Sequence, residues 1–219
     1  MPRLLFEKKG EAVWISHLDL MRVFQRAFKR AGLPLTHTQG FNPRPSVSIA
    51  LPLSVGVASG CELLDFDLDG CDVPLQEIRS RLNDALISGI RVLDVYEQGR
   101  KIRDLSLLRC SVMLEYDDGY PADGIQKLSS LFAQEDVIVS KKTKNGIQDQ
   151  NIIPMIRSLE IAAKGERGIE LEALICCQNP TLNPGQLVAA IRHYVPEMAP
   201  DFSNCTRLEI YDSREEIFR

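Results

Sequence analysis

The stretch SHLDLMRVFQRAFKRAGLPL, residues 16–35, predicts the helix around which the first half of the chain is organised. Ser16 is a good helix N-cap, and Asp19 three residues later resembles the acidic member of a capping box. Gly32 and Pro34 are residue types that end a helix. Between these signals, apolar side chains recur at helical spacing and are expected to face a core: Leu18, Met21, Phe24, Phe28 and Ala31.

Strand-like segments lie on both sides of this helix. Residues 3–10 predict a strand that ends in a turn, and residues 11–16, EAVWIS, predict a second short strand. The elements after the helix follow in order: strands at 46–55 and 61–70, an amphipathic helix at 74–86 and a strand at 90–98. Without the opening strand, this order is β-α-β-β-α-β, which is the ferredoxin-like arrangement of two split βαβ units.

The second half repeats this rhythm of elements. Strands are expected at 107–116, 137–142, 156–164, 168–177 and 205–212, helices at 123–134 and 184–195, and a polar turn at 143–150. We therefore predict an α+β protein of two tandem ferredoxin-like halves, with antiparallel sheets covered by helices on one face. The predicted domains are residues 1–100 and 106–219.

Length and composition are those of a folded, water-soluble protein. The chain has 219 residues, of which 44% are hydrophobic and 26% charged. No run of about 18 apolar residues is present, and the N-terminus lacks the apolar segment of a secretory signal. We expect a cytoplasmic location and no membrane partner.

The six cysteines are not spaced as metal or cluster ligands. They occur at positions 61, 71, 110, 176, 177 and 205, without a C-x-x-C pair and without the C-x-x-x-C-x-x-C pattern of a radical SAM cluster. Reduced, buried thiols explain them. No metal site and no cofactor are expected.

Charge is distributed unevenly along the chain. Residues 1–50 hold eight Lys/Arg and three Asp/Glu, a balance of +5, so the remainder carries −9 for a total of −4. Basic side chains also recur on one side of the first helix: Arg22, Arg26, Lys29 and Arg30. A solvated helix surface explains them, and so does a face that contacts phosphates.

The loop GFNPRP after this helix has the composition of a stiff, ligand-facing segment. Gly40 permits unusual backbone angles, while Asn42 and Arg44 each precede a proline, Pro43 or Pro45, which biases them to extended geometry. Such a loop loses little entropy on binding and would present Arg44 for bidentate contact with phosphate or carboxylate. A rigid connector between helix and strand is the plainer interpretation.

Two histidines are the candidates for acid–base chemistry. His17 begins the first helix and His37 follows its end, and either imidazole could serve as base for a ribose 2′-hydroxyl. A capping or hydrogen-bonded histidine is the plainer interpretation of each. Asp19 is expected to cap the helix with Ser16 rather than to act in catalysis. Neither histidine is assigned as catalytic on this basis.

Taken together, these segments resemble the signature of the radical SAM-linked family, a bacterial domain of unknown function fused to, or encoded beside, radical SAM proteins. The resemblance lies in Ser16-His17-Leu18-Asp19, Gly40-Phe41-Asn42-Pro43-Arg44-Pro45, Leu51-Pro52-Leu53 and Gly56. It implies a radical SAM enzyme as partner. Neighbouring ribonuclease and ribosomal-protein genes in that family imply a connection with RNA.

Three functional hypotheses follow. The favoured one is a non-catalytic RNA-binding module that presents ribosomal or transfer RNA to a radical SAM partner for modification. The second is a metal-independent endoribonuclease of the CRISPR repeat-processing type, whose tandem ferredoxin-like layout is similar. The third is a protein-docking domain whose basic helix meets an acidic surface of the radical SAM enzyme.

Overall fold

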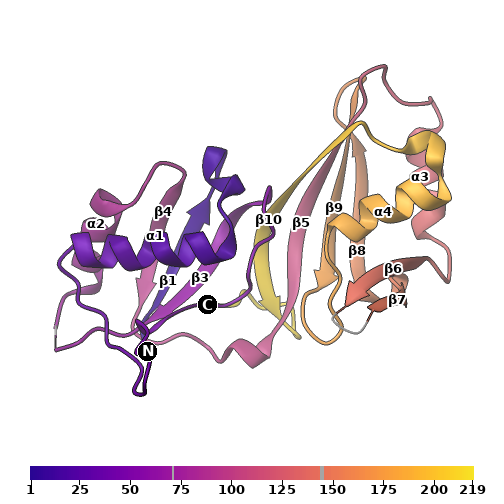
Figure 1. Ribbon diagram of the computed structural model, residues 1–219. Helices are drawn as coiled ribbons and strands as arrows, with labels where there is room; N and C mark the ends of the chain where they lie inside the picture. The colour runs from indigo at the N-terminus through magenta and orange to yellow at the C-terminus, as the bar shows by residue number, and fades with distance from the viewer. Residues whose placement is uncertain (71, 144–145) are drawn as a thin grey trace. The chain divides into compact units, whose positions relative to one another are not determined.

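The computed structural model describes residues 1–70, 72–143 and 146–219. It divides into two compact units, residues 1–104 with 217–219 and residues 105–216 (Figure 1). Both units are mixed α+β, and their strands pair in antiparallel fashion. The predicted α+β class with antiparallel sheets is therefore confirmed. No helix of the described residues is long and apolar enough to cross a membrane.

The first unit contains four strands and two α-helices in the order β-α-β-β-α-β. Its elements are β1 (Arg3–Lys8), the 3₁₀ turn η1 (Gly10–Trp14), α1 (His17–Arg30), β2 (Val47–Ile49), β3 (Ala58–Phe66), α2 (Leu75–Ala85) and β4 (Ile90–Tyr96). The strands lie in the order β4-β1-β3, with β2 paired to β3. The short turn η2 (Ile102–Asp104) follows.

The predicted strand at residues 11–16 is wrong, because this segment forms η1 and the end of the connection to α1. The carbonyls of Val13 and Ile15 accept hydrogen bonds from the Lys8 ammonium instead of from a neighbouring strand. The opening strand β1 is consequently the first strand of the β-α-β-β-α-β order. The predicted strand at 46–55 is also shorter, since only Val47–Ile49 pair with β3.

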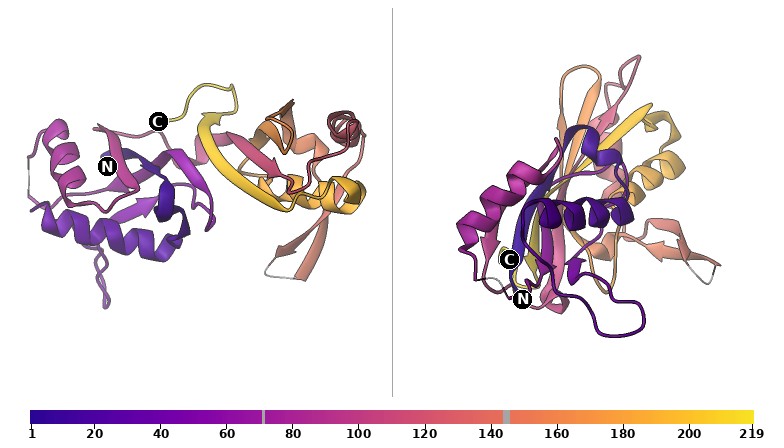
Figure 2. Two further views of the ribbon diagram at one scale, coloured as in Figure 1. Left: turned by 90° about the horizontal axis from the view of Figure 1, so that it is seen from above. Right: turned by 60° about the vertical axis from the view of Figure 1, so that its left-hand side comes forward.

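A single apolar core joins both helices of the first unit to its sheet. The rings of Phe6 and Phe24 lie 4.7 Å apart, and those of Phe28 and Phe66 lie 5.1 Å apart. The buried residues of α1 are Leu20, Phe24, Ala27 and Phe28, and those of α2 are Ile78 and Leu82. Because both sets belong to one cluster, α1 and α2 cover the same face (Figure 2).

Leu18 does not belong to this core, although the apolar periodicity placed it there. Its side chain is 68% exposed, because it lies on the side of the first helical turn that faces away from the sheet. The other end of α1 matches the prediction. Gly32 has a φ of +66°, and Leu33 N–H donates to the Phe28 carbonyl, which closes the helix.

The second unit has the same order of elements with one insertion. Its elements are β5 (Leu105–Glu115), α3 (Gly124–Phe132), β6 (Ile138–Thr143), β7 (Gly146–Asn151), η3 (Ile153–Met155), β8 (Ile156–Ala163), β9 (Gly168–Cys176), α4 (Gly185–Tyr194), η4 (Pro196–Met198) and β10 (Phe202–Asp212). The main strands lie in the order β10-β5-β9-β8, and β6 and β7 form a separate hairpin.

Two details of the second half differ from the sequence prediction. The expected polar turn at 143–150 is wrong at its described residues, because Thr143 belongs to β6 and residues 146–151 pair with β6 as a strand; residues 144–145 lie outside the described residues. The last three residues belong to the first unit rather than to the second. Phe218 is fully buried there, and the guanidinium carbons of Arg3 and Arg100 lie 5.7 and 5.1 Å from the centre of its ring.

Candidate nucleic-acid interface

The N-terminus of α1 is built by the predicted cap. The Asp19 amide donates to the Ser16 hydroxyl oxygen, and that hydroxyl donates to the Asp19 carboxylate at 2.8 Å. Arg22 donates to the other carboxylate oxygen, also at 2.8 Å. The bond from Ser16 and then that from Arg22 lower the pKa of Asp19 below its usual range. Ser16 and Asp19 are thus fully occupied in starting the helix.

His17 turns one of its two imidazole nitrogens into the unit. Its side chain is half-buried, and its Nδ1 is buried with no hydrogen-bond partner among the described residues. This nitrogen cannot reach the hydroxyl of a bound RNA. His37 is exposed and lies beyond the C-terminal end of α1. The two histidines are separated by the 14-residue helix, a length of about 20 Å, so they do not form one catalytic pair.

A buried ammonium holds the segment that leads into α1. Lys8 is only 1% exposed, and its Nζ donates to the Val13 and Ile15 carbonyls at 3.1 and 2.9 Å. Burial lowers the pKa of Lys8, and the buried Glu62 carboxylate opposes that shift. Lys8 therefore cannot contact a phosphate, while Lys9 is engaged in an ion pair with Glu7 at 2.7 Å.

The predicted basic face exists on the outer side of α1. Arg22, Arg26 and Lys29 are exposed, opposite the buried residues of the helix. Arg22 is partly neutralised by its ion pair with Asp19. Arg26 and Lys29 form no ion pair or side-chain hydrogen bond with the described residues. These two cations are therefore free to bind an external anion.

Arg30 has an architectural role in the first unit. Its guanidinium donates to the carbonyl of Ala85, the last residue of α2, whose carbonyl has no partner within its own helix. A pocket of about 430 Å³ lies between these helix ends and is also lined by Arg81. Arg81, which pairs with Glu77, was missed by the sequence analysis although its helix was predicted.

The loop that carries GFNPRP is a narrow hairpin held by its own backbone. Thr38 N–H donates to the Arg44 carbonyl at 2.9 Å, and Arg44 N–H donates to the Thr38 hydroxyl at 3.0 Å. A bridge joins His37 to Pro45, and Ser46 N–H donates to the Thr36 carbonyl. We call residues 36–46 the hairpin; it stands out from the body of its unit (Figure 2).

The tip of the hairpin presents its polar residues to solvent. Gly40 has a φ of +136°, which favours glycine, so the tight turn requires it. The side chains of Asn42 and Arg44 are exposed, and Pro43 and Pro45 hold the adjoining backbone extended. Arg44 has no side-chain partner among the described residues and is therefore available to a ligand.

The two parts of the quoted signature lie at opposite ends of α1. The hairpin follows the C-terminal end of the helix, where Thr36 N–H donates to the Asp67 carbonyl beyond β3. At the N-terminal end, Gly56 N–H donates to the Val13 carbonyl, and the Trp14 ring lies over Gly56. The segment around Gly56, and not the hairpin, therefore adjoins the SHLD turn.

Three exposed apolar side chains belong to the segments that meet at this N-terminal end. Trp14, Leu18 and Val55 are 71%, 68% and 53% exposed. We call these three residues the apolar patch. The sequence pattern does not indicate this patch, because it predicts a strand for EAVWIS and a core position for Leu18.

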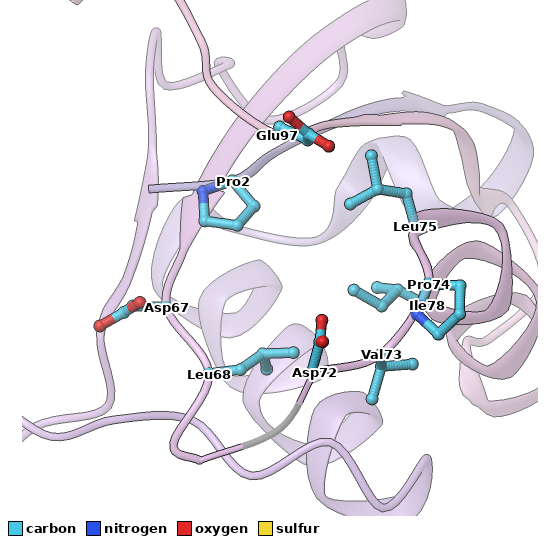
Figure 3. A pocket seen from close by; sticks show the side chains of 9 residues that line it. All are labelled: Pro2, Asp67, Leu68, Asp72, Val73, Pro74, Leu75, Ile78 and Glu97. Atoms are coloured by element: carbon cyan, nitrogen blue, oxygen red, sulfur yellow. The ribbon is translucent and has the colours of Figure 1, made fainter.

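A pocket of about 430 Å³ beside the start of α2 has the opposite charge from α1 (Figure 3). Its apolar lining includes Leu68 and Ile78, and its carboxylates are Asp67, Asp72 and Glu97. Asp67 accepts a hydrogen bond from the Thr36 hydroxyl at the base of the hairpin. These carboxylates repel phosphate, so this pocket does not suit an anionic ligand.

Among the described residues, no three His, Cys, Asp or Glu side chains are grouped so that they could hold a metal ion. The described cysteines are free thiols, four of them buried and Cys205 half-buried. Cys71 lies outside the described residues.

Comparison with known proteins gives a family and a distant fold relative. The family model described as "Uncharacterized protein conserved in bacteria (DUF2344)" matches residues 2–184. No curated protein matches the chain.

Among solved structures, a chain from the crystal structure of a Cbf5-Nop10-Gar1 complex is similar with a TM-score of 0.50 and 8% identity. The match covers 95% of this chain and 48% of that one, so this protein spans about half its length. At this identity, the similarity concerns the fold alone. A structure of an unknown protein from Galdieria sulphuraria is 11% identical over 94% and 96% of the two chains, with a TM-score of 0.26.

Proposed function

The chain belongs to the DUF2344 family of conserved bacterial proteins, and we propose that its first unit binds structured RNA as a non-catalytic accessory module. One observation carries this proposal. Arg26 and Lys29 are exposed on the outer face of α1 without a partner among the described residues, and the helix leads into a stiff hairpin that presents Arg44. Unpaired cations on rigid elements suit phosphate contacts, because their burial against RNA breaks no existing ion pair.

Arg22 and Arg30 have secondary roles in this interface. Arg22 shares its charge with Asp19, and Arg30 is bound to α2, so neither gains a full new ion pair with phosphate. Both still add positive potential along α1. We therefore rank Arg26, Lys29 and Arg44 as the main phosphate contacts.

A salt titration tests the proposal. A structured RNA, such as transfer RNA, would be titrated with the protein between about 50 and 200 mM salt, where each phosphate contact steepens the loss of affinity. The expected result is binding at low salt that weakens steadily as salt increases. Absence of binding, or binding that ignores salt, would overturn the proposal.

The accessory role includes a radical SAM enzyme as the partner. The resemblance of the SHLD, GFNPRP and LPL segments to the radical SAM-linked signature supports this choice, and the apolar patch offers a surface for the partner. A cytoplasmic location is part of the same proposal, since the RNA and the enzyme would be met there. Co-purification of the enzyme with this protein after nuclease treatment tests the direct contact.

We further assign a ferredoxin-like topology to each unit. The strand orders β4-β1-β3-β2 and β10-β5-β9-β8 support this assignment, with the β6–β7 hairpin as an insertion in the second unit. Tandem units of this type would explain why the two halves share an order of elements without sharing motifs.

The endoribonuclease remains a second candidate because His37 is exposed on the same hairpin as Arg44. It requires RNA cleavage in EDTA with a 2′,3′-cyclic phosphate product, lost in His37→Ala. The buried Nδ1 of His17 cannot serve as this base, so His17→Ala is measured beside it to test the other ring nitrogen of His17. RNA that stays intact during long incubation with folded protein would exclude this candidate.

A further inference from the structure

The tip of the hairpin exposes an aromatic ring completely. Phe41 has a relative exposure of 104%, the highest among the exposed large hydrophobic side chains, and lies between Gly40 and Asn42. It forms no ring contact with the described residues. The proposed phosphate contacts do not use it, and the core of the first unit does not contain it.

The backbone that carries the ring is held by the stem of the hairpin. The hairpin stem is closed by the bridge between His37 and Pro45 and by two hydrogen bonds between Thr38 and Arg44. The φ of +136° at Gly40 fixes the turn just before the ring. A partner that stacks on Phe41 therefore meets a ring on preformed backbone, which reduces the entropy lost on binding.

Charge around the ring indicates what kind of partner fits. Arg44 is exposed three residues away on the same tip, and the free cations of α1, Arg26 and Lys29, precede the hairpin in the chain. An aromatic face beside phosphate-binding cations is the combination that proteins use for unpaired nucleotides, whose bases stack on the ring while the backbone meets the cations. A duplex offers no such face, because its bases are already stacked inside the helix.

We propose that Phe41 stacks on an unpaired nucleobase, so that the hairpin reads a single-stranded or loop segment of the RNA. This inference rests on the proposed function and adds the class of RNA to it. Insertion into a bilayer is disfavoured by the rest of the tip, which is polar: His37, Thr38, Gln39, Asn42 and Arg44. One phenylalanine buries too little apolar area to hold a polar hairpin in a membrane.

Binding of two RNAs of equal length, a single-stranded oligouridylate and a perfect duplex, tests the inference. Phe41→Ala is expected to weaken binding of the single strand by roughly 5- to 100-fold, which corresponds to the loss of one stacked base. Its binding to the duplex should stay within about twofold of the unaltered protein, and Phe41→Tyr should restore the single-strand affinity.

A fluorescence measurement reports stacking directly. Trp14 is the only tryptophan, so Phe41→Trp in a Trp14→Phe background carries one reporter at the hairpin tip. Its emission should be quenched when oligouridylate binds and should change little with the duplex. Quenching by the duplex to the same extent would overturn the inference.

The failures of the two proposals are distinguishable. If Phe41→Ala binds both RNAs normally while Arg26→Glu with Lys29→Glu abolishes binding, stacking is wrong and the phosphate interface stands. If the unaltered protein binds neither RNA, the proposed function fails and this inference fails with it. A blue shift of the reporter with anionic phospholipid vesicles, without quenching by RNA, would assign the ring to a bilayer and overturn the inference.

Discussion

The Nζ of Lys8 lies 2.9 Å from the carbonyl oxygen of Ile15, and this hydrogen bond fixes the approach to α1 from inside the first unit. The ammonium is almost fully buried and also serves the Val13 carbonyl. The start of the basic helix is therefore positioned by a cation that never meets solvent.

Replacing this buried cation should destabilise the first unit. Lys8→Met keeps the apolar length of the side chain but removes the ammonium donor to the Ile15 carbonyl, one of the two donors to the Val13 carbonyl, and the cation near Glu62. We expect a loss of about 2–4 kcal/mol in the free energy of unfolding, measured by urea denaturation. Lys9→Met is the matched control, because Lys9 is exposed. Equal effects of the two substitutions would refute the role of Lys8.

Acid should weaken the cap of α1 in a defined range of pH. Because the Ser16 hydroxyl and Arg22 lower the pKa of Asp19, its contribution is fully present above the ordinary value of 3.8 and is lost as pH falls through the lowered pKa. An NMR titration of the Asp19 carboxyl carbon measures this midpoint directly.

Ser16→Ala provides the check on the cause of that shift. Without the hydroxyl donor, the pKa of Asp19 should move up toward its ordinary value. The loss of the N-cap should also cost about 1 kcal/mol of stability at neutral pH. An unshifted Asp19 midpoint in Ser16→Ala would show that Ser16 is not the main cause.

Charge reversal on the outer face of α1 should reduce the affinity for RNA whatever the nucleotide sequence of the RNA. Arg26→Glu with Lys29→Glu removes two phosphate contacts and should lower the slope of log affinity against log salt by about two. The matched control is Arg157→Glu with Arg167→Glu, which makes the same charge change at exposed arginines of the second unit. Similar losses in both double variants would mean that net charge, and not this face, determines binding.

Substitution of Arg30 should affect stability more than RNA binding, and substitution of Arg26 should do the reverse, although both are cations of α1. Arg30→Gln breaks the bond to the Ala85 carbonyl and is expected to lower stability by about 1 kcal/mol, with little change in the salt slope. Arg26→Gln should leave stability within about 0.5 kcal/mol and lower the slope by about one. Thermal unfolding and filter binding of the same samples measure both quantities. A larger slope change for Arg30→Gln would contradict this assignment.

The features that the sequence predicts well are those that depend on a few neighbouring residues. The start and the end of α1 depend on the Ser16 hydroxyl and on Gly32, and both are local signals. The stiffness of the hairpin follows in the same way from Gly40 and the two X-Pro pairs. These parts of the candidate site could be placed without knowledge of the fold.

The features that were missed depend on contacts between distant residues. From the sequence, Lys8 has the appearance of a surface charge. In the structure, the pairing of β1 with β3 places it near Glu62. Arg30 looks equivalent to Arg26 until α2 brings the Ala85 carbonyl beside it, 55 residues further along the chain. Leu18 was assigned to the core because periodicity alone does not show which apolar residue of a first turn faces outward.

Docking of a protein partner should be visible through Trp14. This only tryptophan is 71% exposed in the apolar patch, so the free protein should emit as a solvated indole and be quenched by iodide. Binding of the proposed radical SAM partner should shift the emission to shorter wavelength and protect it from iodide, because an interface core excludes water. Trp14→Ala should abolish co-purification of the enzyme and leave RNA binding unchanged. Ile147→Ala, at a residue of the second unit that is 76% exposed, is the matched control and should retain the enzyme. If Trp14→Ala still co-purifies with it, the apolar patch is not the docking surface.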